Sequence, residues 1–198
     1  CDGWRPQQLM FFCECKNVRL NDFTIEDATG WSCFLHGCEN VTVSGIQIFN
    51  SPYIGENDGI DVDCCHQVTI SDCIINVGDD ALTLRGCNTK LKNPRPCEYV
   101  NISNCVLHSA YAHAIRVGVG SGEIRHCEFS NITVRDSHAA IHINSQYSDK
   151  GTGVHIHDIA FRNFHVTAGQ LAFIRLDYKF VRGKPCAKSI HDIQIENV

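Results

Sequence analysis

The sequence lacks both a basic surface signature and a long apolar run. Lysine and arginine number 17 against 22 aspartate and glutamate residues, which gives a formal net charge of -5, and the cations are scattered along the chain. A nucleic-acid-binding protein normally carries a basic stripe, and a membrane-spanning helix needs about 18 or more consecutive apolar residues, which no stretch supplies. We therefore expect neither nucleic acid nor a membrane as a partner.

Helical patterning and metal-binding cysteine pairs are also missing. No stretch of about twelve residues carries the 3.6-residue apolar stripe of an amphipathic helix. The 13 cysteines include no pair of CxxC knuckles, because Cys13 and Cys15, like Cys64 and Cys65, are spaced too tightly for a zinc ribbon. We expect neither a metal nor a cofactor. The cysteines are expected to be small buried side chains, mostly reduced, and one or two loop disulfides remain open.

Neither end of the sequence looks like the natural end of a protein. The first residue is Cys1, with no initiator methionine and no leader, and residues 195–198 have the pattern of a strand. We interpret residues 1–198 as one domain, and as a monomer, cut from a longer protein at both ends. A repeat protein cut within a repeat exposes sheet edges, so poor solubility is expected.

A short phrase recurs along the chain, and its spacing is the main evidence for the fold. It consists of a β-rich run, a break centred on Ser or Asn, and a second β-rich run, and each run alternates apolar and polar residues as strands do. The first residues of four clear copies lie 23, 27 and 32 residues apart. These copies occupy residues 17–25, 40–48, 67–75 and 99–107, and looser copies begin at Glu123, His155 and Ser189. A constant phrase with a variable step indicates a fixed coil with insertions on one side.

This repeat predicts an all-β fold, a parallel β-helix of about seven coils. A β-sandwich would not repeat a phrase, a leucine-rich repeat would need its own signature, and a β-propeller blade would be longer. Equivalent residues of neighbouring coils then stack about 4.8 Å apart. Cysteines recur at two phrase positions and are expected to form ladders: Cys15, Cys38, Cys65 and Cys97 at one, Cys73 and Cys105 at the other.

One set of polar residues interrupts the repeat pattern and is the candidate site. Asp58 and Asp80 are 22 residues apart, about one coil, so they should lie on neighbouring coils. Asp79 is adjacent to Asp80, and Gly78 before them permits a bend that turns both outward. His113 follows one coil later. Carboxylates this close repel, so at least one should have a raised pKa, and a protonated carboxyl beside an ionised one is what glycoside hydrolysis requires.

These residues resemble the motifs of the polygalacturonases, glycoside hydrolase family 28. That family carries Asn-Thr-Asp-Gly, Gly-Asp-Asp, Gly-His-Gly and Arg-Ile-Lys motifs in this order, and residues 57–61, 78–80 and 112–114 are similar to the first three. The resemblance implies a right-handed parallel β-helix that is secreted or periplasmic and hydrolyses pectic polysaccharide with inversion. It also implies that Asp79 is the general acid, that Asp58 and Asp80 activate water, and that His113 supports the acid or the sugar.

The sequence departs from the family at the fourth motif. His142 and Asn144 stand where the family has its Arg and Lys, which grip the galacturonate carboxylate, and a bidentate Arg is not replaced by His without loss. The carboxylate is then held elsewhere, with Arg85 and Arg116 as candidates, or the sugar is not a simple galacturonate. Tyr147 follows on the same coil and is a candidate for stacking on a sugar ring.

Three functions remain open at this point. The first is an inverting glycosidase acting on galacturonan or rhamnogalacturonan-type linkages. The second is a β-helix lyase or uronate epimerase, in which the aspartates would bind calcium through oxygen ligands. The third is a noncatalytic carbohydrate-binding helix, favoured if the altered fourth motif signals lost activity.

Overall fold

The computed structural model describes residues 7–146, 153–175, 180–181, 184–185 and 189–198. Its secondary structure consists of strands and one 3-10 turn, η1, at Asn88–Lys90. The strands are β1 (Gln8–Cys13), β2 (Lys16–Asn21), β3 (Thr24–Glu26), β4 (Trp31–His36), β5 (Glu39–Ser44), β6 (Gln47–Phe49), β7 (Ile60–Asp63), β8 (His66–Ser71), β9 (Ile74–Val77), β10 (Leu82–Gly86), β11 (Cys97–Ser103), β12 (Val106–Ser109), β13 (His113–Gly120), β14 (Glu123–Asn144), β15 (His155–Arg175), β16 (Phe180–Val181), β17 (Lys184–Pro185) and β18 (Ile190–Glu196). Among the described residues, no helix has the length and apolar character needed to cross a membrane.

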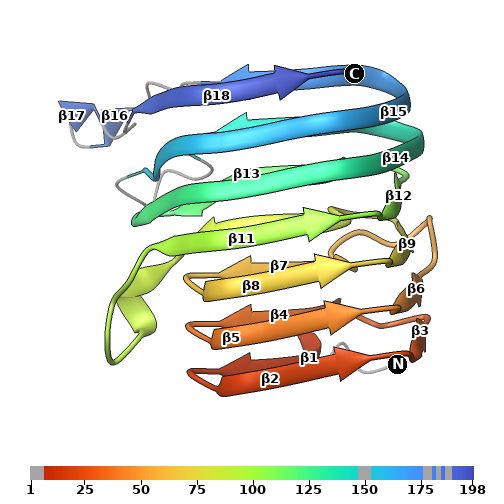
Figure 1. Cartoon of the computed structure of the whole chain (residues 1–198), viewed down its shortest axis with the longest axis horizontal. Coiled ribbons are helices and arrows are strands. Elements are labelled where there is room, and N and C mark those ends of the chain that lie inside the picture. The colour runs from red at the N-terminus through yellow and green to blue at the C-terminus, as the bar shows by residue number, and fades with distance from the viewer. Residues whose placement is uncertain (1–6, 147–152, 176–179, 182–183, 186–188) are drawn as a thin grey trace.

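The strands stack as successive coils of a parallel β-helix, which confirms the predicted fold (Figure 1). In the first coils, one strand from each turn pairs in parallel with its counterpart in the next turn: β1 with β4, β2 with β5 and β3 with β6. Val18 is in register with Val41, Val41 with Val68 and Val68 with Val100, so the spacing of the sequence phrase is the spacing of the coils.

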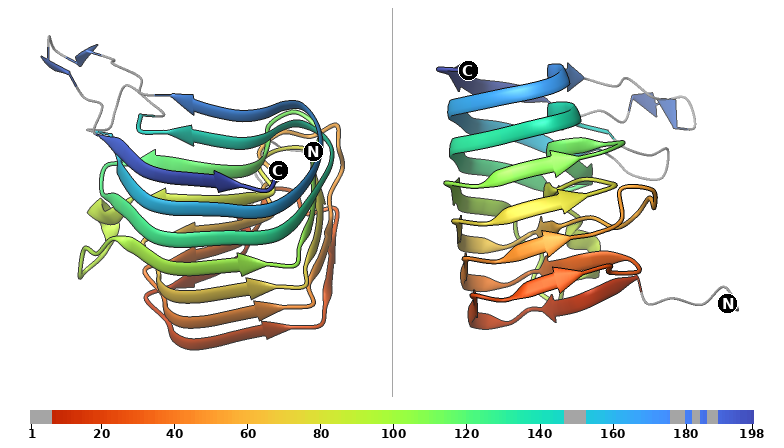
Figure 2. Two further views of the ribbon diagram at one scale, coloured as in Figure 1. Left: turned by 45° about the horizontal axis from the view of Figure 1, so that its top comes forward. Right: turned by 90° about the vertical axis from the view of Figure 1, so that its right-hand side faces the viewer.

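Later coils run continuously around the corners of the helix. The long strand β14 pairs with β11 through its first part and with β13 through its last part. It thereby joins two faces that separate strands form in the earlier coils, and β15 follows the same path (Figure 2). The candidate site lies on one of these faces, that of β4, β7, β10 and β13.

The core is a stack of inward side chains contributed by every coil. Ile70 and Ile102 are fully buried and lie in register on adjacent strands. Phe129 and Phe161 stack in the same way, with ring centroids 4.9 Å apart. Because each layer covers the next, burial of these side chains holds the coils together and fixes the outward-facing residues in rows.

The corners are built from residues with positive φ and from small buried thiols. Asn104, Asn131 and Asn163 all adopt φ between 54° and 59° and hydrogen-bond to one another through their side chains, as asparagine can in the left-handed region. The described cysteines are free thiols. The expected ladder is present, since the Cys38 N–H lies 3.3 Å from the Cys65 sulfur and Cys73 and Cys105 stack at the next corner.

Candidate active site

The three aspartates of the candidate site meet at the entrance to neighbouring strands. Asp58 precedes β7, Asp79 and Asp80 precede β10, and the register that pairs Ile60 with Leu82 places Asp58 beside Asp80. Each of the three offers a carboxylate oxygen, and these oxygens lie within 4.8 Å of one another. The two sequence motifs lie one coil apart, and this spacing brings their side chains together.

Asn57 and Gly78 hold the two motifs against each other. The Asn57 side-chain oxygen accepts the backbone N–H groups of Gly78 and Asp79, at 2.9 and 3.0 Å. A glycine is required at position 78 because a side chain has no room there, not because of its φ. A Cβ on Gly78 would lie 2.2 Å from the Ile54 carbonyl oxygen. The bend before the aspartates is thus fixed by close backbone approach.

We expect Gly78→Ala to displace this bend and to lower the free energy of unfolding by about 1–3 kcal/mol, because the added methyl group has no room. Urea unfolding measures the loss. Gly55→Ala is the matched control, since its added Cβ would meet its nearest neighbour, the Asp79 carboxylate, at 4.0 Å. Equal stability of the two variants would contradict this account of the bend.

Asp80 is the most firmly held of the three carboxylates. One of its oxygens lies 2.6 Å from Nδ1 of His113, and the other accepts a hydrogen bond from Nη1 of Arg116 at 2.9 Å. Burial alone would raise the pKa of Asp80, but the hydrogen bond with His113 and the charge of Arg116 outweigh it, so its pKa is lowered. Asp80 is therefore ionised at neutral pH.

Asp58 has the opposite protonation state. It is only 3% exposed, and burial, together with the charges of Asp61 and Asp80, raises its pKa to about 9 despite the opposing charge of Arg85. The sequence predicts at least one raised pKa in this cluster, and the structure assigns it to Asp58. The site therefore contains two adjacent carboxyl groups, of which Asp58 is protonated and Asp80 is ionised.

Asp79 is the most accessible member of the cluster. It is half-buried, whereas Asp58 and Asp80 are buried. Its two oxygens accept the backbone N–H groups of Glu56, at 2.7 Å, and of Asp80, at 2.9 Å. The carboxyl group is thus fixed in place while part of it faces solvent, where a polymer can approach.

Comparison with known proteins shows the family of this chain. The family model described as glycosyl hydrolases family 28 matches residues 2–198. The chain belongs to this family. A probable polygalacturonase of Arabidopsis thaliana is 25% identical over 203 residues, which cover 100% of this chain and 42% of that protein. Polygalacturonase-2 of Solanum lycopersicum is 23% identical over 202 residues, which cover 87% of this chain and 44% of that protein. The chain therefore spans less than half the length of these relatives.

Solved structures of the family share the fold. The exopolygalacturonase of Thermotoga maritima superposes with a TM-score of 0.65 at 21% identity, covering 77% of this chain and 37% of that one. The family 28 exopolygalacturonase of Yersinia enterocolitica gives a TM-score of 0.62 at 14% identity, covering 92% of this chain and 38% of that one. At these identities the likeness establishes the parallel β-helix and no more.

The two arginines expected to bind substrate both lie beside the aspartate cluster of this family 28 chain and pair with carboxylates. Arg116 forms an ion pair with Asp80 and lies in register with His142 on the adjacent strand β14. Arg85 donates from Nε to Asp61 at 2.6 Å and lies 3.5 Å from Asp58 through Nη2. A substrate carboxylate would have to compete with these internal partners for either guanidinium group.

The other expected substrate-binding residues differ in how they are placed. The ring of His142 packs against that of His113, with centroids 4.1 Å apart, so it belongs to the cluster. Asn144 is buried, and its side-chain oxygen accepts the Gln146 N–H at 2.9 Å. This bond fixes the end of β14. Tyr147 lies outside the described residues.

Sequence reasoning missed a second row of buried polar residues beside the aspartates. Asp61 and Asp63 point outward from β7, where Asp61 binds Arg85 and Asp63 lies 2.9 Å from His36. Burial raises the pKa of Asp61 to about 6, although Arg85 opposes the shift. The signal was available, because the alternation Ile-Asp-Val-Asp at 60–63 places both aspartates on the outer face of an inward-packed strand.

The spacing of the three aspartates would also suit a cation, but their chemistry opposes one. Both oxygens of Asp80 are engaged by His113 and Arg116, whose guanidinium group would face the ion. Asp58 holds a proton at neutral pH, since its pKa is raised to about 9. We therefore assign no metal to this cluster.

Proposed function

We propose that the protein is a glycosidase that hydrolyses galacturonan or rhamnogalacturonan-type linkages of pectic polysaccharides. The observation that carries the proposal is the cluster of three carboxyl groups, in which Asp58 is protonated, Asp80 is ionised and Asp79 faces solvent. Glycoside hydrolysis needs one carboxyl group to protonate the leaving oxygen and another to activate water. Membership of family 28 supports the same chemistry.

The roles follow accessibility and charge. Asp79 donates a proton to the glycosidic oxygen, because it is the carboxyl group that a bound polymer can reach. That proton is the one that Asp58 holds in the unliganded protein, and it passes to Asp79 within the cluster, whose oxygens lie within 4.8 Å of one another. Asp80 accepts the proton of the attacking water, and Asp58 shares in orienting that water. Arg116 and His113 keep Asp80 ionised and in place. The ion pair with Arg116 also weakens Asp80 as a base, because it lowers the pKa.

The stereochemical outcome is part of the proposal. Members of the family that the sequence resembles act with inversion, and we propose inversion here. The carboxylate oxygens lie within 4.8 Å of one another, which is closer than the roughly 6.5–9.5 Å typical of inverting pairs. Proton NMR of the first product, recorded before mutarotation, decides the matter: the inverted anomer supports the proposal and the retained anomer overturns it.

The substrate is proposed to be a pectic polymer in which one of the two sugars joined by the cleaved bond carries no carboxylate. His142 and Asn144 replace two cations of the family motif, and Arg85 and Arg116 are engaged by aspartates. A rhamnogalacturonan-type linkage fits this arrangement better than a galacturonan. As a hydrolase of an extracellular polymer, the protein is proposed to act as a monomer outside the cell or in the periplasm.

The test is a comparison of polygalacturonan with rhamnogalacturonan as substrates. We expect new reducing ends, and faster release from rhamnogalacturonan, without ultraviolet-absorbing unsaturated ends. Calcium-dependent formation of unsaturated ends would show elimination and overturn hydrolysis. Binding without turnover of either polymer would identify a carbohydrate-binding helix instead.

A further inference from the structure

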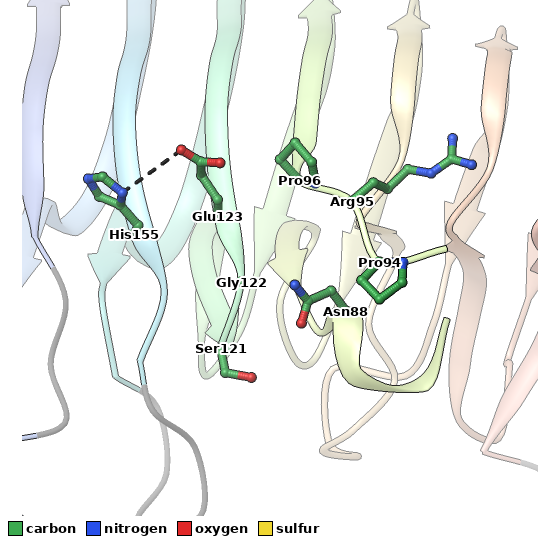
Figure 3. Close-up of a pocket in the computed structure, with 8 residues that line it drawn as sticks. All are labelled: Asn88, Pro94, Arg95, Pro96, Ser121, Gly122, Glu123 and His155. Atoms are coloured by element: carbon green, nitrogen blue, oxygen red, sulfur yellow. Dashed lines mark ion pairs between the residues drawn. The ribbon is translucent and has the colours of Figure 1, made fainter. Parts of the chain in front are cut away.

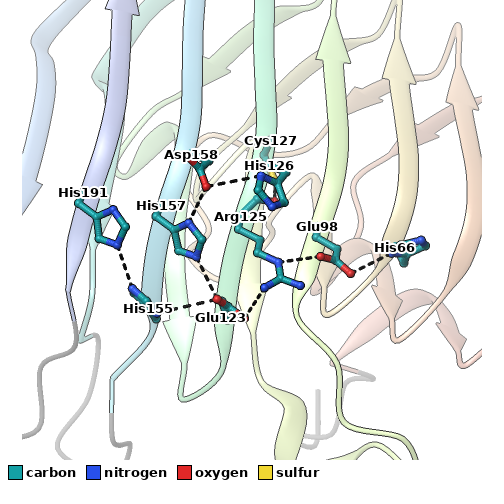
Figure 4. A network of polar contacts seen from close by, with 10 residues as sticks. All are labelled: His66, Glu98, Glu123, Arg125, His126, Cys127, His155, His157, Asp158 and His191. Atoms are coloured by element: carbon teal, nitrogen blue, oxygen red, sulfur yellow. Dashed lines mark hydrogen bonds and ion pairs between the residues drawn. The ribbon is translucent and has the colours of Figure 1, made fainter.

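A second group of polar side chains lies on a different face of the helix, at the starts of β14, β15 and β18 (Figure 4). Glu123 is in register with His155, and His157 is in register with His191. These four side chains project outward from three successive coils. The candidate active site, by contrast, lies at the starts of β7 and β10.

The donor atoms of this group converge on a small volume. Nε2 of His157 lies 2.9 Å from Oε1 of Glu123, and Nε2 of His155 lies 3.2 Å from Nε2 of His191. His155 also turns Nδ1 toward the same Glu123 oxygen, at 3.9 Å. One ligand atom from each of Glu123, His155 and His157 lies within 4.8 Å of the other two. Donor atoms around a tetrahedral ion at about 2.0–2.1 Å lie about 3.3 Å apart, so small side-chain shifts would bring these three into place.

Two carboxylates behind the histidines orient their rings. Asp158 lies 2.7 Å from Nδ1 of His157, and Asp192 lies 2.7 Å from Nδ1 of His191. A carboxylate at Nδ1 directs Nε2 toward a metal and raises its basicity, which is the arrangement found behind most metal-binding histidines. The partner behind His157 is evidence for a metal ligand that is independent of the clustering of the side chains.

We propose that Glu123, His155 and His157 form a binding site for a divalent transition metal ion of the zinc class, with a water molecule as the fourth ligand. Two imidazoles with one carboxylate suit zinc, whereas calcium and magnesium prefer oxygen ligands throughout. In the metal-free protein a proton lies between His157 and Glu123, and the metal ion takes its place.

The surroundings leave the site open to solvent and partly balance its charge. Glu123 and His155 also line a surface hollow of about 510 Å³ (Figure 3), which gives an ion access. Arg125 donates to the other Glu123 oxygen at 3.2 Å but is held more closely by Glu98, at 2.7 Å. Oε1 of Glu123 therefore remains directed toward the histidines, and His126 lies 3.5 Å from the outer carboxylate of Asp158.

A metal ion at this position would cross-link two coils. Its ligands come from β14 and β15, which also meet through backbone pairing, core contacts and the ion pair of Arg162 with Glu128. A ligand that binds only the folded state stabilises that state. We therefore expect zinc to raise the unfolding temperature of the protein and a chelator to reverse the shift.

The direct test is a titration of the chelator-treated protein with zinc in competition with a chromophoric chelator. We expect about one equivalent to bind. His157→Gln should abolish this binding, and Asp158→Asn should weaken it by about 10- to 100-fold, the usual effect of removing a carboxylate behind a ligand. His66→Gln is the matched control, because this histidine lies on the same face but pairs with Glu98. It should bind zinc as the parent protein does.

Cobalt substitution separates this site from the cysteines. The described thiols include the exposed Cys13, which can bind soft metals. Visible bands of a four-coordinate cobalt ion without thiolate charge-transfer bands support the proposal. Charge-transfer bands, zinc binding that survives His157→Gln in a protein of unchanged circular dichroism, or no binding to the parent protein would each overturn it.

Discussion

Replacing Asp79 by Asn is expected to lower kcat on a pectic substrate by about 100- to 10,000-fold, the contribution typical of a general acid. Asp79 is half-buried and forms no ion pair among the described residues, so the fold should survive the change. Initial rates of reducing-end release measure the effect. Asp72→Asn is the control, because this exposed aspartate lies at a corner and bonds Asn104.

A substrate with an activated leaving group shows whether Asp79 is the acid. An aryl glycoside whose leaving group needs no proton should restore most of the rate to Asp79→Asn, because the lost step is bypassed. It should not restore Asp80→Asn, in which water activation is lost. Restoration in Asp58→Asn instead would move the acid to the carboxyl group that holds a proton in the unliganded protein, and would contradict the assigned roles.

Replacing Arg85 by Met is expected to lower the free energy of unfolding by about 3–5 kcal/mol at pH 8, because it leaves a buried carboxylate without its partner. Asp61 is fully buried, and Arg85 lies 2.6 Å from it while its guanidinium carbon stacks 4.5 Å from the centre of the Trp31 ring. Methionine preserves much of the packing, so the loss reports mainly on charge. Chemical denaturation measures it.

The loss of stability should depend on pH. Burial already raises the pKa of Asp61 to about 6 with Arg85 present, and removing the cation raises it further. A group whose pKa is higher in the folded state loses its stabilising contribution as pH rises, so Arg85→Met should be more stable at pH 5 than at pH 8. Arg85→Met combined with Asp61→Asn should recover much of the stability. No recovery would show that packing on Trp31, rather than the charge pair, accounts for the loss.

The coil and the meeting of the aspartates could be predicted because both depend on a constant spacing. The phrase around Val41, Val68 and Val100 fixes the register of the coils, and that register carries Asp58 to Asp80 and Asp80 to His113. Insertions such as residues 88–96 do not disturb this spacing, because they lie between β10 and β11. Side-chain stacking in a repeat fold thus follows from sequence alone.

The ionic partners could not be predicted in the same way. Arg116 and Arg85 were candidates for binding a sugar, yet their long side chains reach Asp80 and Asp61 in neighbouring strands. Which carboxylate an arginine selects depends on rotamers and on local burial, and neither has a periodic signal. The histidines at 155, 157 and 191 went unnoticed for a related reason, since they gather only when the loosest copies of the phrase are placed in register.

Hydrolysis of a pectic glycoside by the aspartate cluster can be followed by running the reaction in water labelled with heavy oxygen. Hydrolysis predicts one labelled oxygen atom at each new reducing end in the product's mass spectrum, formed by the parent protein and lost in Asp80→Asn. Unlabelled product incubated in the same water corrects for exchange. Cleaved product that carries no label beyond this exchange would contradict the account.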